Sequence, residues 1–590
     1  MNSLMRLLPY ARGYVWHFVG VILLVLVYNG TSVLQPYLVK IAIDQDITGP
    51  APNLHGLMEI AGLYLLVAVA GLAANYTQVQ LLQYAGQSVI RKIRIALFSH
   101  IERQSMRFFD TNAVGRLVTN VSSDTETVSQ FFTNFFLSMV RDGLSLVLIV
   151  VAMYQLDVRI ASYCMGLIPI LFAISLAFRR RLRDRYQTTR TRLSNIIAFL
   201  AENLAGMRII QIFHQEERQA GAFAELNGLH RRASVAEYRL SVMFNRTFEL
   251  LGNVAVAAVV WVGGWAVLRH TIPFGTLYAF ITYIRQFFQP INSITQQWNT
   301  LQSTIVAADR IGKVLAVQPD VAEPVHPLPL EALPPIRGEV RFENITFAYT
   351  PGRPVLHGVS FTVPAGAFVG FVGATGAGKS SLMSLLTRFY DPQEGRITID
   401  GIDIRRLRLA DLHRIVGLVQ QEVYLFTGTV ADNIRLFRPD ISDEAVVAAA
   451  RAVGAHEVIE RLPEGYQTRL FAKGANLSMG ERQLISFARI VALNPPILIL
   501  DEATANLDSQ TEALVQAGLE AVAKNRTTLV IAHRLSTIRH ADRIVVLHQG
   551  RIVEEGTHEA LLALGGLYAE LHRKSAVDAA ETGSAGSAAR

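Results

Sequence analysis

Long apolar runs dominate the first half of the chain. Six of them, each close to the roughly 20 residues that cross a bilayer as a helix, appear before residue 300. A short amphipathic piece, SLMRLLPYAR, precedes the first run and is typical of a helix that lies on the membrane surface. The pattern predicts six membrane-spanning helices, with approximate bounds Val15–Ile43, Leu57–Leu82, Phe132–Tyr154, Ile160–Phe178, Leu250–Leu268 and Phe274–Ile294.

The segments between these runs differ in length and charge. The connections after the first, third and fifth runs are short, whereas residues 83–131 and 179–249 are long and basic. Because basic loops stay on the cytoplasmic side, we expect the N-terminus and both long loops to be cytoplasmic. The long loops also have helical periodicity, so the spanning helices are predicted to continue as long cytoplasmic extensions.

The pattern changes after Arg310. Residues 318–336 are rich in proline, as in a linker, and from Gly338 onward apolar strands such as AFVGFVG and TTLVIAH alternate with helical segments. The final residues have the composition of a disordered tail. We therefore predict a transmembrane domain over 1–310, a linker over 311–337, an α/β domain over 338–575 and a tail over 576–590.

Composition favours a membrane protein over a nucleic-acid-binding one. Hydrophobic residues make up 51% of the chain and charged residues 17%. The net charge of +7 is gathered in blocks such as RRRLRDRYQTTRTR beside apolar runs, as expected from the positive-inside bias. The single cysteine, Cys164, excludes an intramolecular disulfide and a Cys-rich zinc site. The first apolar run lacks a small-residue cleavage site, so we expect no cleaved signal peptide.

The stretch 373-GATGAGKS-380 has the most specific chemistry. It fits the pattern G-x-x-x-x-G-K-[ST], follows an apolar strand and opens the helical segment SSLMSLLTRF. Its glycines let backbone N–H groups surround phosphate oxygens at a helix N-terminus. Lys379 is placed to reach the β- and γ-phosphates, and Ser380 to bind Mg²⁺. The motif in this context predicts a nucleotide site.

An acidic motif, 497-ILILDE-502, follows later in the chain. By itself, an apolar run that ends in two acids is a plain strand end as often as it is a Mg²⁺-binding motif. Together with the P-loop, Asp501 is predicted to hold the water shell of Mg²⁺, and Glu502 to act as the base for the attacking water. The pair of motifs predicts ATP hydrolysis.

These motifs resemble those of a bacterial multidrug-type ABC exporter half-transporter, over residues 1 to about 575. The resemblance implies a six-helix transmembrane bundle with long cytoplasmic helix extensions, fused to an α/β P-loop ATP-binding cassette. It also implies that residues 108–124 and 202–218 form coupling helices that rest on the cassettes. Tyr349 would stack on adenine, Gln421 would contact Mg²⁺ and His533 would contact the γ-phosphate. The implied ATP-binding residues are Tyr349, Gly373, Ala374, Thr375, Gly376, Ala377, Gly378, Lys379, Ser380, Ser381 and Asp501, and the implied Mg²⁺ ligands are Ser380, Gln421 and Asp501.

In the resembled family each ATP site is completed by the signature turn of a second cassette, and a further residue, here Asp508, crosses to that cassette. The matching turn here is Leu477, Ser478, Met479, Gly480 and Glu481, where the family has Leu-Ser-Gly-Gly-Gln. The Met479 side chain narrows the close approach that glycine allows, and the Glu481 carboxylate repels a docked triphosphate. The departure favours a heterodimer, whose second half-transporter supplies a standard signature to the site built on Glu502. A homodimer with two weakened sites is the alternative.

The resemblance implies ATP-driven export of small amphipathic or drug-like molecules by alternating access, across the inner membrane of a bacterium. A lipid or lipid-linked flippase is the first alternative, and an ATP-gated channel or regulatory ATP-binding receptor is a second. Intact Glu502 and His533 argue against a channel, because gating needs little turnover. Among ionisable residues near the spans, Glu249 and Arg285 are candidates for a substrate cavity. Asp142 is expected to pair locally with Arg141.

Overall fold

The computed structural model describes residues 5–49, 52–166, 168–501, 509–531 and 538–574. The chain divides into two compact units. We call them the helical unit, residues 1–102 and 114–317, and the cassette unit, residues 103–113 and 318–590. The short segment 103–113 thus belongs with the cassette, although it directly follows a helix of the helical unit in sequence.

Long helices build the helical unit. Helix α3 alone has 49 residues, about 70 Å at 1.5 Å per residue, which is more than twice the thickness of a bilayer's hydrocarbon core. The predicted helical extensions beyond the bilayer are therefore confirmed. The long helices are α2 (Val15–Ile41), α3 (Leu54–Glu102), α7 (Phe136–Leu156), α9 (Ile168–Ala205), α11 (Glu216–Leu268) and α12 (Phe274–Ala316). The shorter elements are η1 (Leu8–Tyr14), η2 (Ala42–Ile47), α5 (Val114–Thr119), η3 (Asn120–Asp124), α6 (Thr125–Gln130), η4 (Phe131–Phe135), α8 (Val158–Met165) and α10 (Met207–Ile212).

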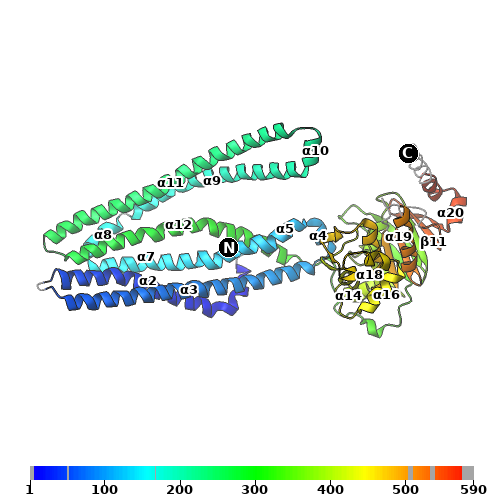
Figure 1. Ribbon diagram of the computed structural model, residues 1–590, viewed down its shortest axis with the longest axis horizontal. Coiled ribbons are helices and arrows are strands. Elements are labelled where there is room, and N and C mark those ends of the chain that lie inside the picture. The colour runs from blue at the N-terminus through cyan, green and yellow to red at the C-terminus, as the bar shows by residue number, and fades with distance from the viewer. Residues whose placement is uncertain (1–4, 50–51, 167, 502–508, 532–537, 575–590) are drawn as a thin grey trace. The chain divides into compact units, whose positions relative to one another are not determined.

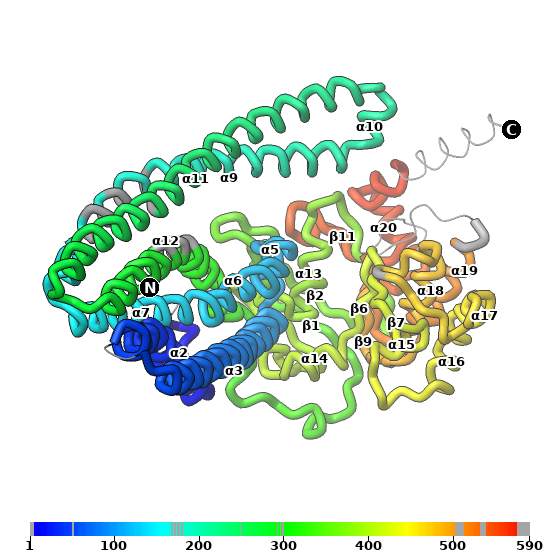
Figure 2. The backbone as a smooth tube through the Cα atoms, turned by 60° about the vertical axis from the view of Figure 1, so that its left-hand side comes forward, coloured from blue at the N-terminus to red at the C-terminus, as the bar shows by residue number. Residues whose placement is uncertain are grey.

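Two groups of helices are visible within this unit. Helices α9 and α11 lie side by side as a long hairpin, with α10 at its tip, in both Figure 1 and Figure 2. Helices α2, α3, α7 and α12 lie together in the other group (Figure 1). Buried polar contacts fix this second group: the Tyr283 hydroxyl donates to the Val33 carbonyl at 2.7 Å, and the Asn29 amide donates to the Arg141 carbonyl at 2.8 Å.

Several helices of this unit are suited to a bilayer. Within the described residues, 4 helical segments are long and apolar enough to cross a membrane: Leu8–Ile47, Leu54–Glu102, Val114–Leu156 and Glu216–Leu268. They expose large apolar side chains, such as Leu65 at 65% and Leu72 at 70%, as expected for a surface that faces lipid. The protein is therefore a multi-pass membrane protein, and the number of six spans stays a prediction.

Among the residues that the structure describes, three sheets organise the cassette unit. An antiparallel sheet has the order β2-β1-β4-β5, a six-stranded sheet has the order β12-β11-β3-β10-β9-β6, and β7 pairs with β8. The inner strands β3, β10 and β9 are buried along almost their whole length, which explains why each is a continuous apolar run rather than an alternating one. The strands are β1 (Val340–Phe347), β2 (Leu356–Val363), β3 (Phe368–Val372), β4 (Glu394–Ile399), β5 (Ile402–Asp403), β6 (Val416–Val419), β7 (Gly428–Thr429), β8 (Arg469–Leu470), β9 (Ile497–Asp501), β10 (Thr527–Ile531), β11 (Arg543–His548) and β12 (Arg551–Gly556).

Helices pack around the six-stranded sheet, and α15 and α16 lie against α18 (Figure 2). They are α13 (Lys379–Leu386), α14 (Leu409–Ile415), α15 (Val430–Arg435), α16 (Asp443–Ala452), α17 (His456–Glu460), α18 (Met479–Leu493), α19 (Ser509–Ala523) and α20 (His558–Leu564), with short turns η5 (Leu330–Ala332), η6 (Ile404–Arg406), η7 (Gly465–Gln467) and η8 (Ala472–Gly474).

The Pro-rich segment before β1 is bound to the cassette. The guanidinium of Arg388, which is buried, donates to the Ala322 carbonyl at 3.0 Å and pairs with Asp391 at 3.0 Å. Further along, the Leu328 N–H donates to the Arg406 carbonyl at 3.0 Å. The cassette surface therefore positions this segment along its length.

Helix α4 (Met106–Thr111) also packs in the cassette unit. The Tyr390 hydroxyl, four residues beyond the end of α13, donates to a carboxylate oxygen of Asp110. Arg107 forms an ion pair with Asp320, with 3.4 Å between Nε and Oδ2. Two segments that connect directly to helical-unit helices, one after α3 and one after α12, are thus tied to each other and to the cassette.

Candidate nucleotide site

The P-loop, Asp501 and Gln421 lie at or just after the ends of neighbouring parallel strands. In the six-stranded sheet, β3 pairs in parallel with β10, β10 with β9, and β9 with β6. The carboxyl ends of parallel strands lie at one edge of a sheet, which is where α/β folds bind ligands. The P-loop follows β3, Asp501 ends β9, and Gln421 comes shortly after β6. The topology therefore brings these sequence motifs to one edge.

The P-loop turns sharply between β3 and α13. Gly376 has a φ of +83° and Gly378 a φ of +103°, the left-handed region that side-chain-bearing residues seldom adopt. A Cβ at Gly378 would lie 2.7 Å from Leu356 Cδ2, so this position also lacks room for a side chain. The turn directs successive backbone N–H groups and the N-terminus of α13 toward one point, which suits a phosphate group.

Lys379 places its ammonium group inside this loop. Its side chain is buried, and Nζ donates to the carbonyls of Gly373 at 2.5 Å and Ala374 at 3.2 Å. Burial lowers the pKa of Lys379, and the negative charge of Asp501 opposes that shift. The loop thus holds a positive charge beside the phosphate cradle, with a carboxylate across from it.

Oxygen ligands suited to a small hard cation lie at the same edge. The Ser380 side chain is exposed at the first turn of α13, Asp501 is half-buried at the end of β9, and Gln421 is exposed. Hydroxyl, carboxylate and amide oxygens are the donors that Mg²⁺ prefers. The residues present are therefore chemically suited to the cation.

Tyr349 is held by a small aromatic cluster. Its ring makes edge-to-face contacts with Phe347, at 4.8 Å between ring centroids, and with Tyr390, at 5.1 Å. Its hydroxyl donates to the Ser381 Oγ at 3.1 Å, which ties the residue to the P-loop helix. The side chain is 39% exposed, so part of the ring is available for stacking on a base.

The turn 477–481 begins helix α18. Ser478 is the N-cap: its hydroxyl accepts from the Glu481 N–H at 3.3 Å, and the Glu481 carboxylate accepts from the Ser478 N–H at 2.7 Å. This reciprocal pair is a capping box. The Ser478 hydroxyl and N–H are thereby engaged within the turn, and a negative charge lies at the positive end of the helix. Leu477 and Gly480 are buried, whereas the Met479 side chain is exposed.

Three predicted site residues, Glu502, Asp508 and His533, lie outside the described residues. The strands that lead to Glu502 and His533, β9 and β10, both end at the edge that carries the P-loop.

One structural link near the site was missed in the sequence. The half-buried guanidinium of Arg489 on α18 donates to the Tyr424 carbonyl at 3.3 Å and to the Asn433 carbonyl at 3.0 Å. Burial lowers the pKa of Arg489 to about 10, so the group stays charged at neutral pH. The segment after Gln421 is therefore fixed to the helix that carries the turn 477–481. A lone arginine in the apolar stretch ISFARIV was the available signal.

Two of the ionisable residues weighed near the spans, Glu249 and Asp142, pair with an arginine on their own helix. Glu249 pairs with Arg246 on the same helix at 2.5 Å, and both side chains are exposed. Arg285 is exposed on α12, and the described residues show no contact between it and Glu249. The expected local pair of Arg141 with the buried Asp142 is confirmed, at 3.0 Å.

Comparison with known families assigns both units. Residues 18–291 match the ABC transporter transmembrane region, and residues 356–505 match the ABC transporter family. A bacterial Atm1-family ABC exporter solved with ATP bound superimposes with a TM-score of 0.77 at 30% identity, covering 95% of this chain and 98% of the other.

Curated relatives extend over most of the chain. An uncharacterized ABC transporter ATP-binding protein of Bacillus subtilis is 38% identical over 96% of this chain and 93% of its own length. A probable multidrug resistance ATP-binding/permease protein of the same species is 38% identical over 88% of this chain and 77% of its own length. An ATP-dependent lipid A-core flippase of Syntrophus aciditrophicus is 35% identical over 97% of this chain and 94% of its own length.

Proposed function

Because the chain belongs to the ABC transporter family, as an exporter half-transporter that couples ATP hydrolysis to export, we propose that it forms one half of an exporter for small amphipathic molecules. Two cassettes in that exporter share two ATP sites. The observation that carries this proposal is that, within one chain, the phosphate-binding loop and the signature turn belong to different structural elements. The P-loop and Asp501 belong to one sheet edge, while the turn 477–481 is the N-terminus of α18, a separate helix.

The proposed substrate class rests on the substrates that the names of the relatives give. Relatives are named as multidrug export proteins, which favours amphipathic, drug-like compounds. A lipid or lipid-linked substrate is the second candidate, because two relatives, matched over 97% and 84% of this chain, are named as lipid A-core flippases. Glu249 and Arg285 stay candidates for the substrate cavity.

Mg²⁺ accompanies ATP in this proposal. Ser380, Asp501 and Gln421 supply the oxygen ligands, and the ion would neutralise phosphate charge beside Lys379. Glu502 is the proposed base and His533 the proposed γ-phosphate contact. Tyr349 and residues 373–381 hold the base and the phosphates.

The partner is proposed to be a different half-transporter. The capping box places the Glu481 carboxylate at the helix end to which a phosphate from the partner's site would bind. Two unit charges about 4 Å apart repel by about 4 kcal/mol at an effective dielectric constant of 20. A site completed by this turn is therefore expected to hydrolyse slowly, whereas a site built on Glu502 needs a standard signature from the partner.

Helices α4 and α10 are the proposed couplers between membrane and cassette. Helix α4 packs on its own cassette through Asp110. Around α10, Ile209, Ile212 and Phe213 are each more than 60% exposed, an apolar tip that suits docking on the partner's cassette. In this arrangement the N-terminus and the cassette are cytoplasmic, and the membrane is the inner membrane of a bacterium.

Reconstitution tests the proposal. Purified chain in liposomes, alone and with a second half-transporter from the same genome, is assayed for ATP hydrolysis and for uptake of amphipathic dyes or labelled lipids. We expect substrate-stimulated hydrolysis and transport only with the second chain. Full activity of the chain alone would establish the homodimer instead, and dye or lipid uptake decides between the two substrate classes.

A further inference from the structure

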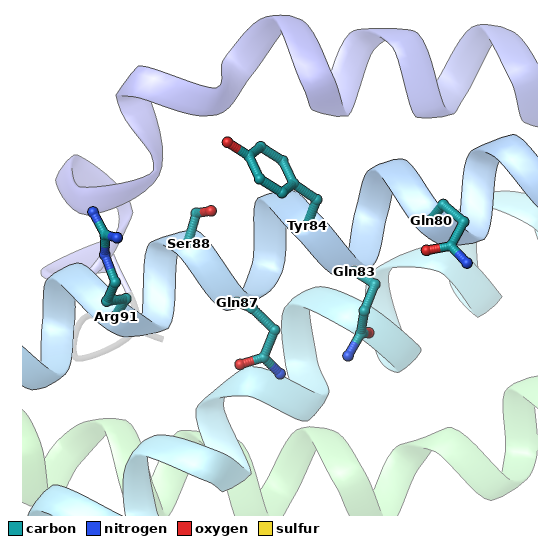
Figure 3. Close-up of a pocket in the computed structure, with 6 residues that line it drawn as sticks. All are labelled: Gln80, Gln83, Tyr84, Gln87, Ser88 and Arg91. Carbon is teal, nitrogen blue, oxygen red and sulfur yellow. The ribbon is translucent and has the colours of Figure 1, made fainter.

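A shallow groove lies on helix α3, next to the end of α2 that follows the N-terminal turn η1. It has a volume of about 400 Å³ and is lined by Gln80, Gln83, Tyr84, Gln87, Ser88 and Arg91. Figure 3 shows Tyr84, Ser88 and Arg91 directed to one side of α3 and Gln83 and Gln87 to the other. The Tyr84 ring lies 5.8 Å from the His17 ring of α2, and the Gln87 amide bonds Ser129 of α6 at 3.2 Å. The groove therefore lies between α2 and α6.

The groove begins where the lipid-type surface of α3 ends. Leu65, Leu66 and Leu72, earlier on the helix, are 65%, 65% and 70% exposed, as expected for side chains among acyl chains. At the groove the exposed residues become glutamine, serine and arginine. Trp16 at the start of α2 is 84% exposed and Tyr84 is 62% exposed. Exposed tryptophan and tyrosine beside an apolar band mark the level of the lipid headgroups.

Basic residues outnumber acidic ones around the groove, where Glu126 of α6 pairs with Arg94 of α3 at 3.9 Å. No Asp or Glu occurs between Met1 and Ile43, nor between Glu59 and Glu102, whereas Arg91 and Lys92 lie on α3. Lys92 Nζ lies 4.7 Å from the Tyr14 ring centroid, which holds the ammonium beside η1. Arg91 has no ion-pair or hydrogen-bond partner among the residues that the structure describes. A free guanidinium beside neutral donors lacks only an anion.

The rings of Tyr14, His17 and Tyr84 pack together beside the groove. His17 Nδ1 is buried and has no hydrogen-bond partner in the described part of the chain, although its ring touches both Tyr14 and Tyr84. The Tyr84 and Ser88 hydroxyls lie on the same side of α3 as the Arg91 guanidinium (Figure 3), and these groups together suit a phosphodiester.

We propose that this groove binds the headgroup of an anionic phospholipid, in the leaflet adjacent to the protein's N-terminal end. The acyl chains would lie against the exposed leucines of α2 and α3, and the phosphate would pair with Arg91. The lipid would act as a ligand that joins the N-terminal elements to α3, and it is separate from the exported substrate. This inference depends on membrane insertion and not on the proposed substrate or partner.

Native mass spectrometry of the full-length protein tests it, with phosphatidylglycerol and phosphatidylcholine supplied in equal amounts. We expect preferential retention of phosphatidylglycerol, and about a fivefold loss of that retention in Arg91→Gln, the effect of one basic residue at an anionic surface. The matched control is Arg231→Gln, an exposed arginine of α11, which should retain phosphatidylglycerol like the unaltered chain. Arg91 is exposed, so its replacement should not impair folding, and monodisperse elution verifies this.

Three results would overturn the proposal. The first is equal retention of the two lipids, or equal losses in Arg91→Gln and Arg231→Gln, because either would indicate general charge attraction. The second is displacement of phosphatidylglycerol by excess glycerol phosphate, which would make a soluble phosphate ester the ligand. The third is retention by monomers and loss in dimers, which would show that a second chain fills the groove.

Discussion

The Tyr390 hydroxyl donates a hydrogen bond to Asp110, although the two residues are 280 positions apart in the chain. Burial raises the pKa of Tyr390, and the bond to Asp110 raises it further, so the phenol stays protonated and remains a donor. The Tyr390 ring also makes an edge-to-face contact with Tyr349, the proposed adenine contact. Tyr390 therefore links Asp110 of helix α4 to Tyr349, the residue proposed to stack on adenine. The first prediction concerns this link.

Replacing Tyr390 by phenylalanine removes the hydroxyl and keeps the ring that packs on Tyr349. A hydrogen bond to a charged group contributes about 1.5–3 kcal/mol, so we expect substrate stimulation of ATP hydrolysis to fall at least about tenfold. Basal hydrolysis should persist. The measurement is ATPase activity in liposomes with and without a transported dye.

Two comparisons isolate the bond. Asp110→Ala removes the same bond from the other side, so the double variant should lose no more than either single variant. Tyr466→Phe is the matched control, because it removes a hydroxyl that contacts His456 at 2.9 Å, elsewhere on the cassette. Additive losses in the double variant would contradict a direct role for the bond.

Glu502→Gln tests the proposed base and the pump together. Removing a general base lowers hydrolysis by about 10²–10⁴-fold, while the P-loop and Lys379 should still bind ATP. We expect nucleotide binding to be retained and transport to be abolished. Glu520→Gln, a change of an exposed residue on α19, serves as control and should leave transport intact. Substrate movement that continues in Glu502→Gln would indicate a channel rather than a pump.

Glu481→Gln tests the altered signature turn. Glutamine can also close a capping box, so α18 should keep its start while the charge facing a bound phosphate disappears. Combined with Met479→Gly, which reopens the close approach, this change should raise hydrolysis at the slower site by about tenfold, since even part of the repulsion of two nearby charges corresponds to that factor. Single-turnover hydrolysis of pre-bound ATP measures it.

The control for this prediction is Glu444→Gln, which removes an acid from the first turn of another cassette helix, α16. It should leave hydrolysis unchanged. A decrease in the Glu481 variant would mean that the carboxylate assists the site, and the heterodimer proposal would lose its physical basis.

Arg388→Ala tests the attachment of the segment before β1. Arg388 is buried and bonds Asp391, Ala322 and Leu407, so its loss leaves several acceptors unsatisfied. Leaving these acceptors without their buried donor should cost about 1–3 kcal/mol of the free energy of unfolding. Arg396→Ala removes an exposed pair with Glu343 and should cost about 1 kcal/mol or less. Thermal unfolding of the full-length protein in detergent measures both. Equal shifts of the two variants would show that the segment adds nothing to stability.

Two parts of the nucleotide site could be located in the sequence because they depend on local chemistry. The P-loop needs glycines at fixed spacing for its turn, and β9 needs a continuous apolar run because it is covered on both faces. Each requirement can therefore be recognised within a single short stretch of the sequence. The order of the strands in the sheet did not follow from such patterns. Strand β10 follows β3, β6 and β9 in the sequence, yet it lies between β3 and β9 in the sheet.

The sequence by itself determined the class of this protein: apolar runs long enough for a bilayer, followed by a cassette with phosphate-binding and acidic motifs in the family's order. Only the tertiary structure decided which distant residues meet: Tyr390 with Asp110, Arg107 with Asp320, Arg489 with the segment after Gln421, and His17 with Tyr84. The physical reason is that these contacts are made by single side chains at long sequence separation. A single polar residue leaves no periodic pattern, and its partner is chosen by how the strands and helices pack.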